Sequence, residues 1–292
     1  MTAAATTTVA VAQLDGQDQD ERFREVLELH GERTSPFVLA RAAWHWREVL
    51  VLLARKEFHV KYRRMSFGTM WAVFLPVLQS VVMAVVFSRL VRFSIPHYAV
   101  FILSGMVAWT YFANVFGAGS TAIAGSADLS SRVYFPRALL PLVQVTTNLY
   151  GLVIMLAVAL ILAIPLGAHL GLYTLWFLPG AALLVVFASS LVLTSAALHV
   201  YFRDVSYITN ALVLLLLYVS PVIYSPAVAP HIVRPIIDAN PLTGILDLFH
   251  AGVGDPTSMG LALGVTAAWT VVLSCAAVAL HSRFDRVFTD LL

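Results

Sequence analysis

Hydrophobic and polar positions divide the chain into long uncharged runs and short polar segments. Residues 65–88 carry no Lys, Arg, Asp or Glu, and neither do residues 138–202. A helix needs about 20 apolar residues to cross the ~30 Å hydrocarbon core of a bilayer. The first run therefore predicts one membrane span. The second run is too long for one span and predicts two, with a break at the Pro- and Gly-containing stretch 165–171.

The whole pattern predicts an all-α integral membrane protein with six transmembrane helices. The predicted spans lie at about 67–90, 98–122, 139–164, 174–200, 206–224 and 258–280. With their connections they form a transmembrane domain over residues 65–282, and residues 283–292 follow as a short cytoplasmic tail.

Two segments precede this domain. Residues 1–34 are polar and acidic with few large apolar side chains, which predicts a flexible cytoplasmic tail, with room for a short helix at 20–30. In residues 35–64, apolar side chains recur near helical spacing among Arg and Lys. This pattern is typical of an amphipathic helix lying in the membrane interface. A cytosolic helix packed on a partner protein is the alternative.

Residues 225–257 are apolar but divided by prolines into pieces too short to cross a membrane. Apolar pieces of about 10–14 residues are more often re-entrant or interfacial than spanning. The segment therefore predicts short re-entrant helices between the fifth and sixth spans, and an ordinary folded outer loop is the alternative.

Composition agrees with a membrane protein, and the distribution of charge predicts its orientation in the membrane. The chain is 60% hydrophobic and 12% charged, whereas soluble domains carry about 25% charged residues. Its single cysteine, Cys275, leaves no intramolecular disulfide. Of the 18 Lys and Arg, only Arg89, Arg92 and Arg234 fall on one predicted side. Because basic loops stay on the cytoplasmic side, both termini are predicted to be cytoplasmic.

The sequence carries no pattern typical of an enzyme. Its two lysines, Lys56 and Lys61, follow no phosphate-binding glycine-rich loop, and no Cys/His group has metal-ligand spacing. The predicted spans lack charged residues of the kind on which ion-coupled pumps depend. Six histidines fall at predicted span ends or in loops, where most such residues are interfacial: His97, His169, His199, His231, His250 and His281. We therefore expect a transport subunit with no metal, cofactor or nucleic-acid partner, whose energy source lies on another chain.

Aromatic side chains suggest a more specific hypothesis. Rings with a polar tip can stack on sugars and also hydrogen-bond to hydroxyl groups. A carbohydrate path is therefore hypothesised along six residues: Trp109, Tyr111, Phe112, Tyr150, Tyr218 and Tyr224. Aromatic belts at the membrane interfaces are the alternative explanation.

Five blocks in fixed order then resemble a known family. They are RKEFHVKYRRMSFGTMWAVFLPVLQ (55–79), RVYFPRALLPL (132–142), YFRDVSYI (201–208), SPVIYS (220–225) and NPLTGILDLFH (240–250). Over about residues 40–292 the chain resembles the ABC-2 permeases that export polysaccharides and polyol phosphates, such as O-antigen, teichoic acid or cell-wall galactan.

This resemblance implies a homodimer in the bacterial inner membrane with two ATP-binding subunits, which would carry the ATP and Mg²⁺. It implies a polyprenyl-pyrophosphate-linked glycan as substrate, among the surrounding membrane lipids. An ABC-2 exporter of a drug or lipid, or a membrane scaffold without transport activity, is the alternative.

The resemblance also implies roles for two groups of residues. ATPase coupling would involve Asp128, Arg132, Tyr134, Phe135, Pro136 and Arg137, and also Arg203 and Asp204 of the second cytoplasmic loop. An ordinary cytoplasmic loop with positive flanks is the alternative for residues 128–137. Whichever function holds, Arg203 and Asp204 are expected to form a local ion pair. The 35–64 helix would act as a gate that attracts the head group through Arg41, Arg47, Arg55, Lys56, Lys61, Arg63 and Arg64. Simple orientation of the protein by positive charge is the alternative role of these basic residues.

Overall fold

The computed structural model describes residues 44–63, 66–90, 97–126, 136–168, 171–226, 229–255 and 259–284. All of these ranges belong to one compact unit over residues 36–292. Within them every regular element is a helix, which confirms the predicted all-α class. The predicted tail 1–34 and residues 285–292 lie outside the described ranges.

Five of the six predicted spans correspond to helices that are long and apolar enough to cross a membrane. They are α4 (Trp71–Leu90), α5 (Tyr98–Gly119), α7 (Leu139–Ala163), α8 (Phe177–Tyr201) and α12 (Met259–Phe284). The 3-10 turns η1 (Gly68–Met70) and η3 (Leu172–Trp176) lead directly into α4 and α8, and η2 (Ala124–Ser126) follows α5.

The sixth helix, α9 (Val205–Val219), has 15 residues and ends before the predicted boundary at 224. The cause is local: Ser220 precedes Pro221 and has an extended backbone with ψ of 143°. A helix of this length is shorter than the ~20 residues that a full crossing needs. Six crossings therefore stay a prediction.

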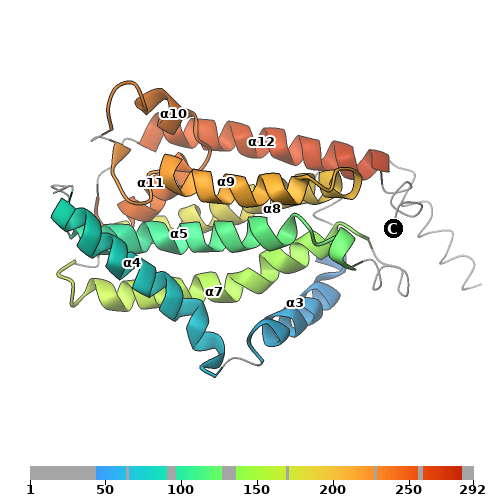
Figure 1. The fold of residues 1–292 in the computed structure, drawn as a ribbon, viewed down its shortest axis with the longest axis horizontal. Coiled ribbons are helices and arrows are strands. Elements are labelled where there is room, and N and C mark those ends of the chain that lie inside the picture. Colours follow the sequence, from blue (N-terminus) through green and yellow to red (C-terminus); the bar gives the residue numbers. More distant parts are fainter. Residues whose placement is uncertain are drawn as a thin grey trace, which may run out of the picture. The chain divides into compact units, whose positions relative to one another are not determined.

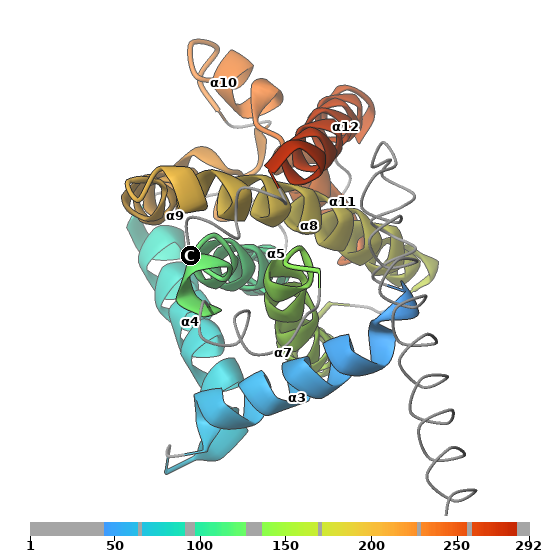
Figure 2. The same ribbon diagram turned by 90° about the vertical axis from the view of Figure 1, so that its right-hand side faces the viewer.

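Helix α5 is the centre of the bundle, with α4, α7, α8 and α9 around it (Figure 2). In the most apolar part of α5, 78% of the residues are buried, against 11% in the corresponding part of α4 and 22% in that of α12. The main hydrophobic core gathers on its side chains, including Phe101, Met106 and Phe112. Among the described long helices α5 is therefore the one most fully surrounded by protein, while α4 and α12 present most of their surface outward.

Segment 225–257 contains two short helices, α10 (Arg234–Ala239) and α11 (Thr243–Ala251). Both lie at the end of the bundle where α12 begins (Figure 1). Every residue of α11 is buried, and the helix packs on α5, α8 and α12. The short helices agree with the prediction, whereas their depth in a membrane stays a prediction.

Helix α3 (Arg47–Tyr62) lies against α7 near the start of α4 (Figure 2). Its Ala54 is fully buried, and the Thr147 hydroxyl on α7 approaches the Ala54 carbonyl at 3.4 Å. The rings of Phe58 and Tyr150 pack with centroids 5.4 Å apart. One side of the predicted amphipathic helix is thus covered by its own chain, and interfacial placement of the other side stays a prediction.

Candidate functional site

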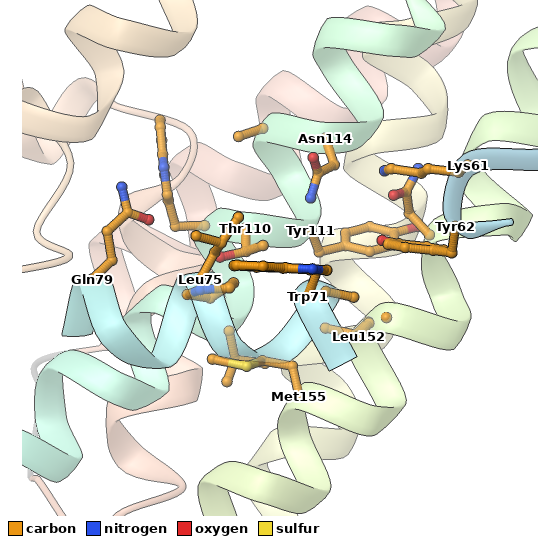
Figure 3. Close-up of a pocket in the computed structure, with 17 residues that line it drawn as sticks. Lys61, Tyr62, Trp71, Leu75, Gln79, Thr110, Tyr111, Asn114, Leu152 and Met155 are labelled. Atoms are coloured by element: carbon orange, nitrogen blue, oxygen red, sulfur yellow. The ribbon is translucent and has the colours of Figure 1, made fainter. Parts of the chain in front are cut away.

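A cavity of about 590 Å³ opens between the end of α3 and helices α4, α5 and α7 (Figure 3). Its volume falls in the range of small-molecule sites, about 300–1,000 Å³. The lining comprises Lys61, Tyr62, Trp71, Ala72, Leu75, Pro76, Gln79, Val107, Trp109, Thr110, Tyr111, Ala113, Asn114, Asn148, Gly151, Leu152 and Met155. Among these described lining residues Lys61 is the one charged side chain, so they give the pocket a positive end and no negative one.

The positive end comes from the last turn of α3. The Lys61 ammonium lies 5.8 Å from the centroid of the neighbouring Tyr62 ring. The Lys61 side chain as a whole is exposed, but the protein around its ammonium group removes part of the hydration and lowers its pKa below the usual value, and the nearby carboxylate of Glu57 opposes that shift. An ammonium that has lost part of its hydration gains by contact with an anion. This end of the pocket is therefore suited to a phosphate group.

Aromatic rings form the middle of the pocket. Trp71 and Tyr111 lie between Lys61 at one end and Gln79 at the other (Figure 3). The Tyr111 hydroxyl donates to the Val145 carbonyl at 3.3 Å, which fixes the ring against α7. Such fixed rings offer an apolar surface on which a planar or ring-shaped ligand can lie.

Uncharged polar side chains complete the lining. The amides of Gln79 and Asn114 are exposed, and neither forms a hydrogen bond with any other residue that the structure describes. Asn148 is buried, and its amide nitrogen donates to the Gln144 carbonyl at 2.8 Å. Pro76 has no N–H to donate to the Ala72 carbonyl one turn earlier. The pocket wall therefore offers both donors and acceptors.

The structure separates the six aromatic residues of the predicted carbohydrate path. Trp109 and Tyr111 line the pocket, whereas Phe112 is buried in the core between Phe116 and Phe187. The remaining residues lie elsewhere: Tyr150 packs on α3, Tyr218 is 63% exposed on α9, and the Tyr224 hydroxyl donates to the Val219 carbonyl at 2.8 Å. The described residues place two of the six in one cavity.

Of the five predicted head-group residues that the structure describes, Lys61 is the one that lines the pocket. Arg55, Lys56 and Arg63 are exposed. The guanidinium of Arg47 lies over the Trp44 ring at 5.2 Å and donates to the Trp44 carbonyl. Arg41 and Arg64 lie outside the described residues.

The predicted coupling block is described in part. Asp128, Arg132, Tyr134 and Phe135 lie outside the described residues. Arg137 is half-buried, and its Nη1 atom has no hydrogen-bond partner in the part of the chain that the structure describes. Arg203 and Asp204 are exposed at the turn between α8 and α9. They form no ion pair with each other, so that local expectation is wrong: both side chains are exposed, and an exposed ion pair gains little.

Two buried polar residues lie on α11: His250, for which an interfacial position was expected, and Asp247, to which no role was assigned. His250 is fully buried and stacks on Phe101 with ring centroids 3.7 Å apart. Its Nε2 donates to the Pro221 carbonyl at 2.9 Å, and its Nδ1 lies 3.1 Å from the Ser104 hydroxyl. The expectation of an interfacial histidine is therefore wrong for His250. His281 is also buried, at 4% exposure.

Asp247, one turn before His250, is 2% exposed. Burial raises the pKa of its carboxyl to about 7, and the charges of Asp255 and Asp238 add to that effect. Burial lowers the pKa of His250 to about 4. Across the described residues, no group of three or more His, Cys, Asp or Glu is arranged to hold a metal ion.

The residues that line the pocket fall within a region that matches a known protein family. Residues 48–253 match the family model of the ABC-2 type transporter. That range covers more than half of the chain and includes every residue that lines the pocket. The chain belongs to the ABC-2 type transporter family.

Among the proteins similar to this ABC-2 chain are proteins named as export permeases. It is 28% identical over 215 residues to the O-antigen export system permease protein RfbA of Myxococcus xanthus, covering 73% of this chain and 83% of that protein. It is 27% identical over 213 residues to the protein of the same name from Klebsiella pneumoniae, covering 70% and 82%. The ABC-2 chain is thus a multi-pass membrane protein similar to export permeases over most of its length.

Proposed function

We propose that this chain is the permease subunit of an ATP-driven exporter that moves a polyprenyl-pyrophosphate-linked polysaccharide outward across the bacterial inner membrane. The observation that carries the proposal is the similarity to O-antigen export permeases over about seven-tenths of the chain and four-fifths of each relative. The pocket supports it independently, because its cationic end and its amide and aromatic walls suit a phosphate group attached to a sugar.

In the proposed assembly two copies of this chain work with two ATP-binding subunits, which bind ATP and Mg²⁺. The segment 126–137 and the turn at Arg203 and Asp204 contact those subunits on the cytoplasmic side, where both termini also lie. Nucleotide-driven closure of the partner subunits shifts these contacts and opens the path. The long helices then transmit the movement as rigid elements, because their backbone hydrogen bonds are satisfied internally.

A deletion strain tests the proposal directly. Removal of this chain should abolish the surface polysaccharide and leave its lipid-linked form inside the cell, and a plasmid copy should restore both. The purified complex with its ATPase should also hydrolyse ATP faster when the lipid-linked glycan is added. Unchanged surface glycan after deletion would contradict the proposal. In that case, stimulation of the ATPase by a drug or a free lipid would favour the other type of ABC-2 exporter.

A further inference from the structure

The polar side chains in the pocket lie on helices that are otherwise apolar. Gln79 is on α4, Asn114 on α5 and Asn148 on α7, and all three helices are long and apolar enough to cross a membrane. An amide without a hydrogen-bond partner is costly in hydrocarbon, by about 2 kcal/mol or more. The exposed Gln79 and Asn114 amides therefore favour a polar content of this cavity over lipid tails.

The side chains of the pocket are arranged in order from a cationic end to an uncharged polar end. Lys61 lies at one end, the rings of Trp71 and Tyr111 lie in the middle, and Gln79 lies at the other end (Figure 3). The Asn114 side chain points into the space above the two rings (Figure 3). A ligand that is anionic at one end and rich in hydroxyl groups at the other would meet a matching partner at each position.

Size limits the ligand further. The cavity of about 590 Å³ has room for one or two sugar rings with a phosphate group, and not for a polymer. The described residues of the lining include no Asp or Glu, which also disfavours a cationic ligand. The pocket is therefore suited to the beginning of a glycan chain, where a sugar is joined to a phosphate.

We infer that this pocket binds the phosphate-proximal sugar of the substrate within a single protomer, with Lys61 at the phosphate and Gln79 and Asn114 at the sugar hydroxyl or acetamido groups. The inference rests on the proposed function and adds to it a step that selects the first sugar. A site built to hydrogen-bond a ligand discriminates against an analogue that lacks those groups, because its polar atoms are then left unpaired.

The lysine content of the chain provides a sensitive assay. Lys56 and Lys61 are its two lysines, both exposed on α3, and of the two only Lys61 lines the pocket. The full chain in nanodiscs would be treated with an amine-reactive label, and the modification of each lysine measured by mass spectrometry. Lys56 serves as an internal control for non-specific electrostatic binding.

Four probes would be compared as protectants: a polyprenyl diphosphate carrying one N-acetylhexosamine, the same lipid without the sugar, soluble N-acetylhexosamine 1-phosphate, and inorganic pyrophosphate. We expect both sugar-bearing probes to protect Lys61 at concentrations about tenfold lower than their sugar-free counterparts, with Lys56 unaffected. Protection by the lipid-linked probe alone would still support the site and would identify the lipid head group as the source. Equal protection with and without the sugar, equal protection of both lysines, or no protection would overturn the inference.

Variants then test the assigned groups. Asn114→Ala and Gln79→Ala should each reduce the tenfold preference for the sugar-bearing probe while leaving protection by pyrophosphate unchanged. Asn210→Ala, an exposed amide on α9 outside the pocket, is the matched control and should keep the full preference. If the deletion strain loses its surface glycan but these variants keep the preference, the pocket assignment fails and the export function stands. If the deletion changes no surface glycan, the export function fails whatever the labelling shows.

Discussion

At the scale of single residues, the most constrained polar groups lie on α11. His250 is held on both ring nitrogens and by stacking on Phe101, and Asp247 lies one helical turn before it. Burial shifts their pKa values in opposite directions, toward the neutral form of each group. Both residues therefore make the stability of this region depend on pH, with opposite signs.

Replacement of Asp247 by Asn should reveal how much this carboxyl contributes to the pH dependence of stability. The carboxyl has a pKa of about 7 in the folded protein and 3.8 as the reference value, so the folded state binds the proton more tightly. Its ionisation therefore costs stability progressively as pH rises from about 4 to about 7. The melting temperature of Asp247→Asn minus that of the wild type should increase between pH 5 and pH 8.

The contribution of His250 is present in both proteins and cancels in this difference. Asp204→Asn, which changes an exposed aspartate at the start of α9, is the matched control for the loss of one carboxyl group. Parallel curves for Asp247→Asn and the wild type across this range would contradict the assignment of a raised pKa.

At the scale of elements, close contacts at glycine determine how α11 fits into the bundle. A Cβ atom at Gly244 would lie 2.6 Å from the Ala262 carbonyl oxygen and 2.6 Å from the Thr266 hydroxyl on α12. That hydroxyl donates to the Pro241 carbonyl at 2.7 Å, just before α11 begins. Small residues at such contacts let helix backbones approach closely. The fit of α11 against α12 therefore depends on the missing side chain.

Gly244→Ala should separate these two helices, because a backbone carbonyl cannot move aside as a flexible side chain can. We expect a loss of about 1–3 kcal/mol in the free energy of unfolding, the usual cost of overpacking. This loss of stability should appear as a lower melting temperature when aggregation of the protein in detergent is followed on heating. Gly117→Ala on α5 is the matched control, because its Cβ would meet no atom within 4 Å. A similar effect of both substitutions would mean that close packing at Gly244 is not the cause.

At the scale of the whole molecule, the two ends of the bundle differ in what they carry. Figure 1 shows α10 and α11 at one end and the terminus of α12 at the other. Arg234 lies exposed at the start of α10, whereas Arg137 lies half-buried just before α7. The proposed function assigns ATPase coupling to the end that contains Arg137. Reversal of one charge at each end, in separate variants, therefore distinguishes a loss of ATPase coupling from a general effect of the changed charge.

Arg137→Glu should reduce co-purification of the ATPase subunit by at least about tenfold, since loss of one member of a buried charge contact at an interface costs about 2–5 kcal/mol. Export should fall with it, while the amount of this chain in the membrane fraction stays unchanged. Arg234→Glu reverses an exposed charge at the opposite end and should leave both measurements unaffected. A normal export rate in Arg137→Glu would contradict the coupling role.

Much of the fold could be predicted from the sequence, because a membrane imposes severe constraints on a chain. A span must be long, apolar and internally hydrogen-bonded, and these requirements leave a readable pattern of uncharged runs. The predicted ranges 98–122 and 139–164 accordingly coincide with α5 and α7 to within a few residues. The end of α9 was misjudged because the apolar pattern continues past Ser220 and Pro221, where the helix stops.

The pocket was predictable only in fragments. Lys61, Trp109 and Tyr111 were predicted for separate reasons. Gln79, Asn114 and Asn148 are uncharged, so the absence of charged residues from the spans gave no sign of them. Attention to single Gln and Asn residues in apolar runs would have identified these amides as unusual.

Taken alone, the sequence determined the class, the approximate helices and the family of this protein, since each depends on patterns that are local along the chain. Only the tertiary structure decided which side chains share a cavity and which are buried. The lining of the pocket is drawn from four helices spread over residues 61–155, and α11 is buried because three other helices surround it. Helix α5 carries apolar residues on every face, so no periodicity indicates which neighbour each side chain meets. That choice is made by packing between distant segments.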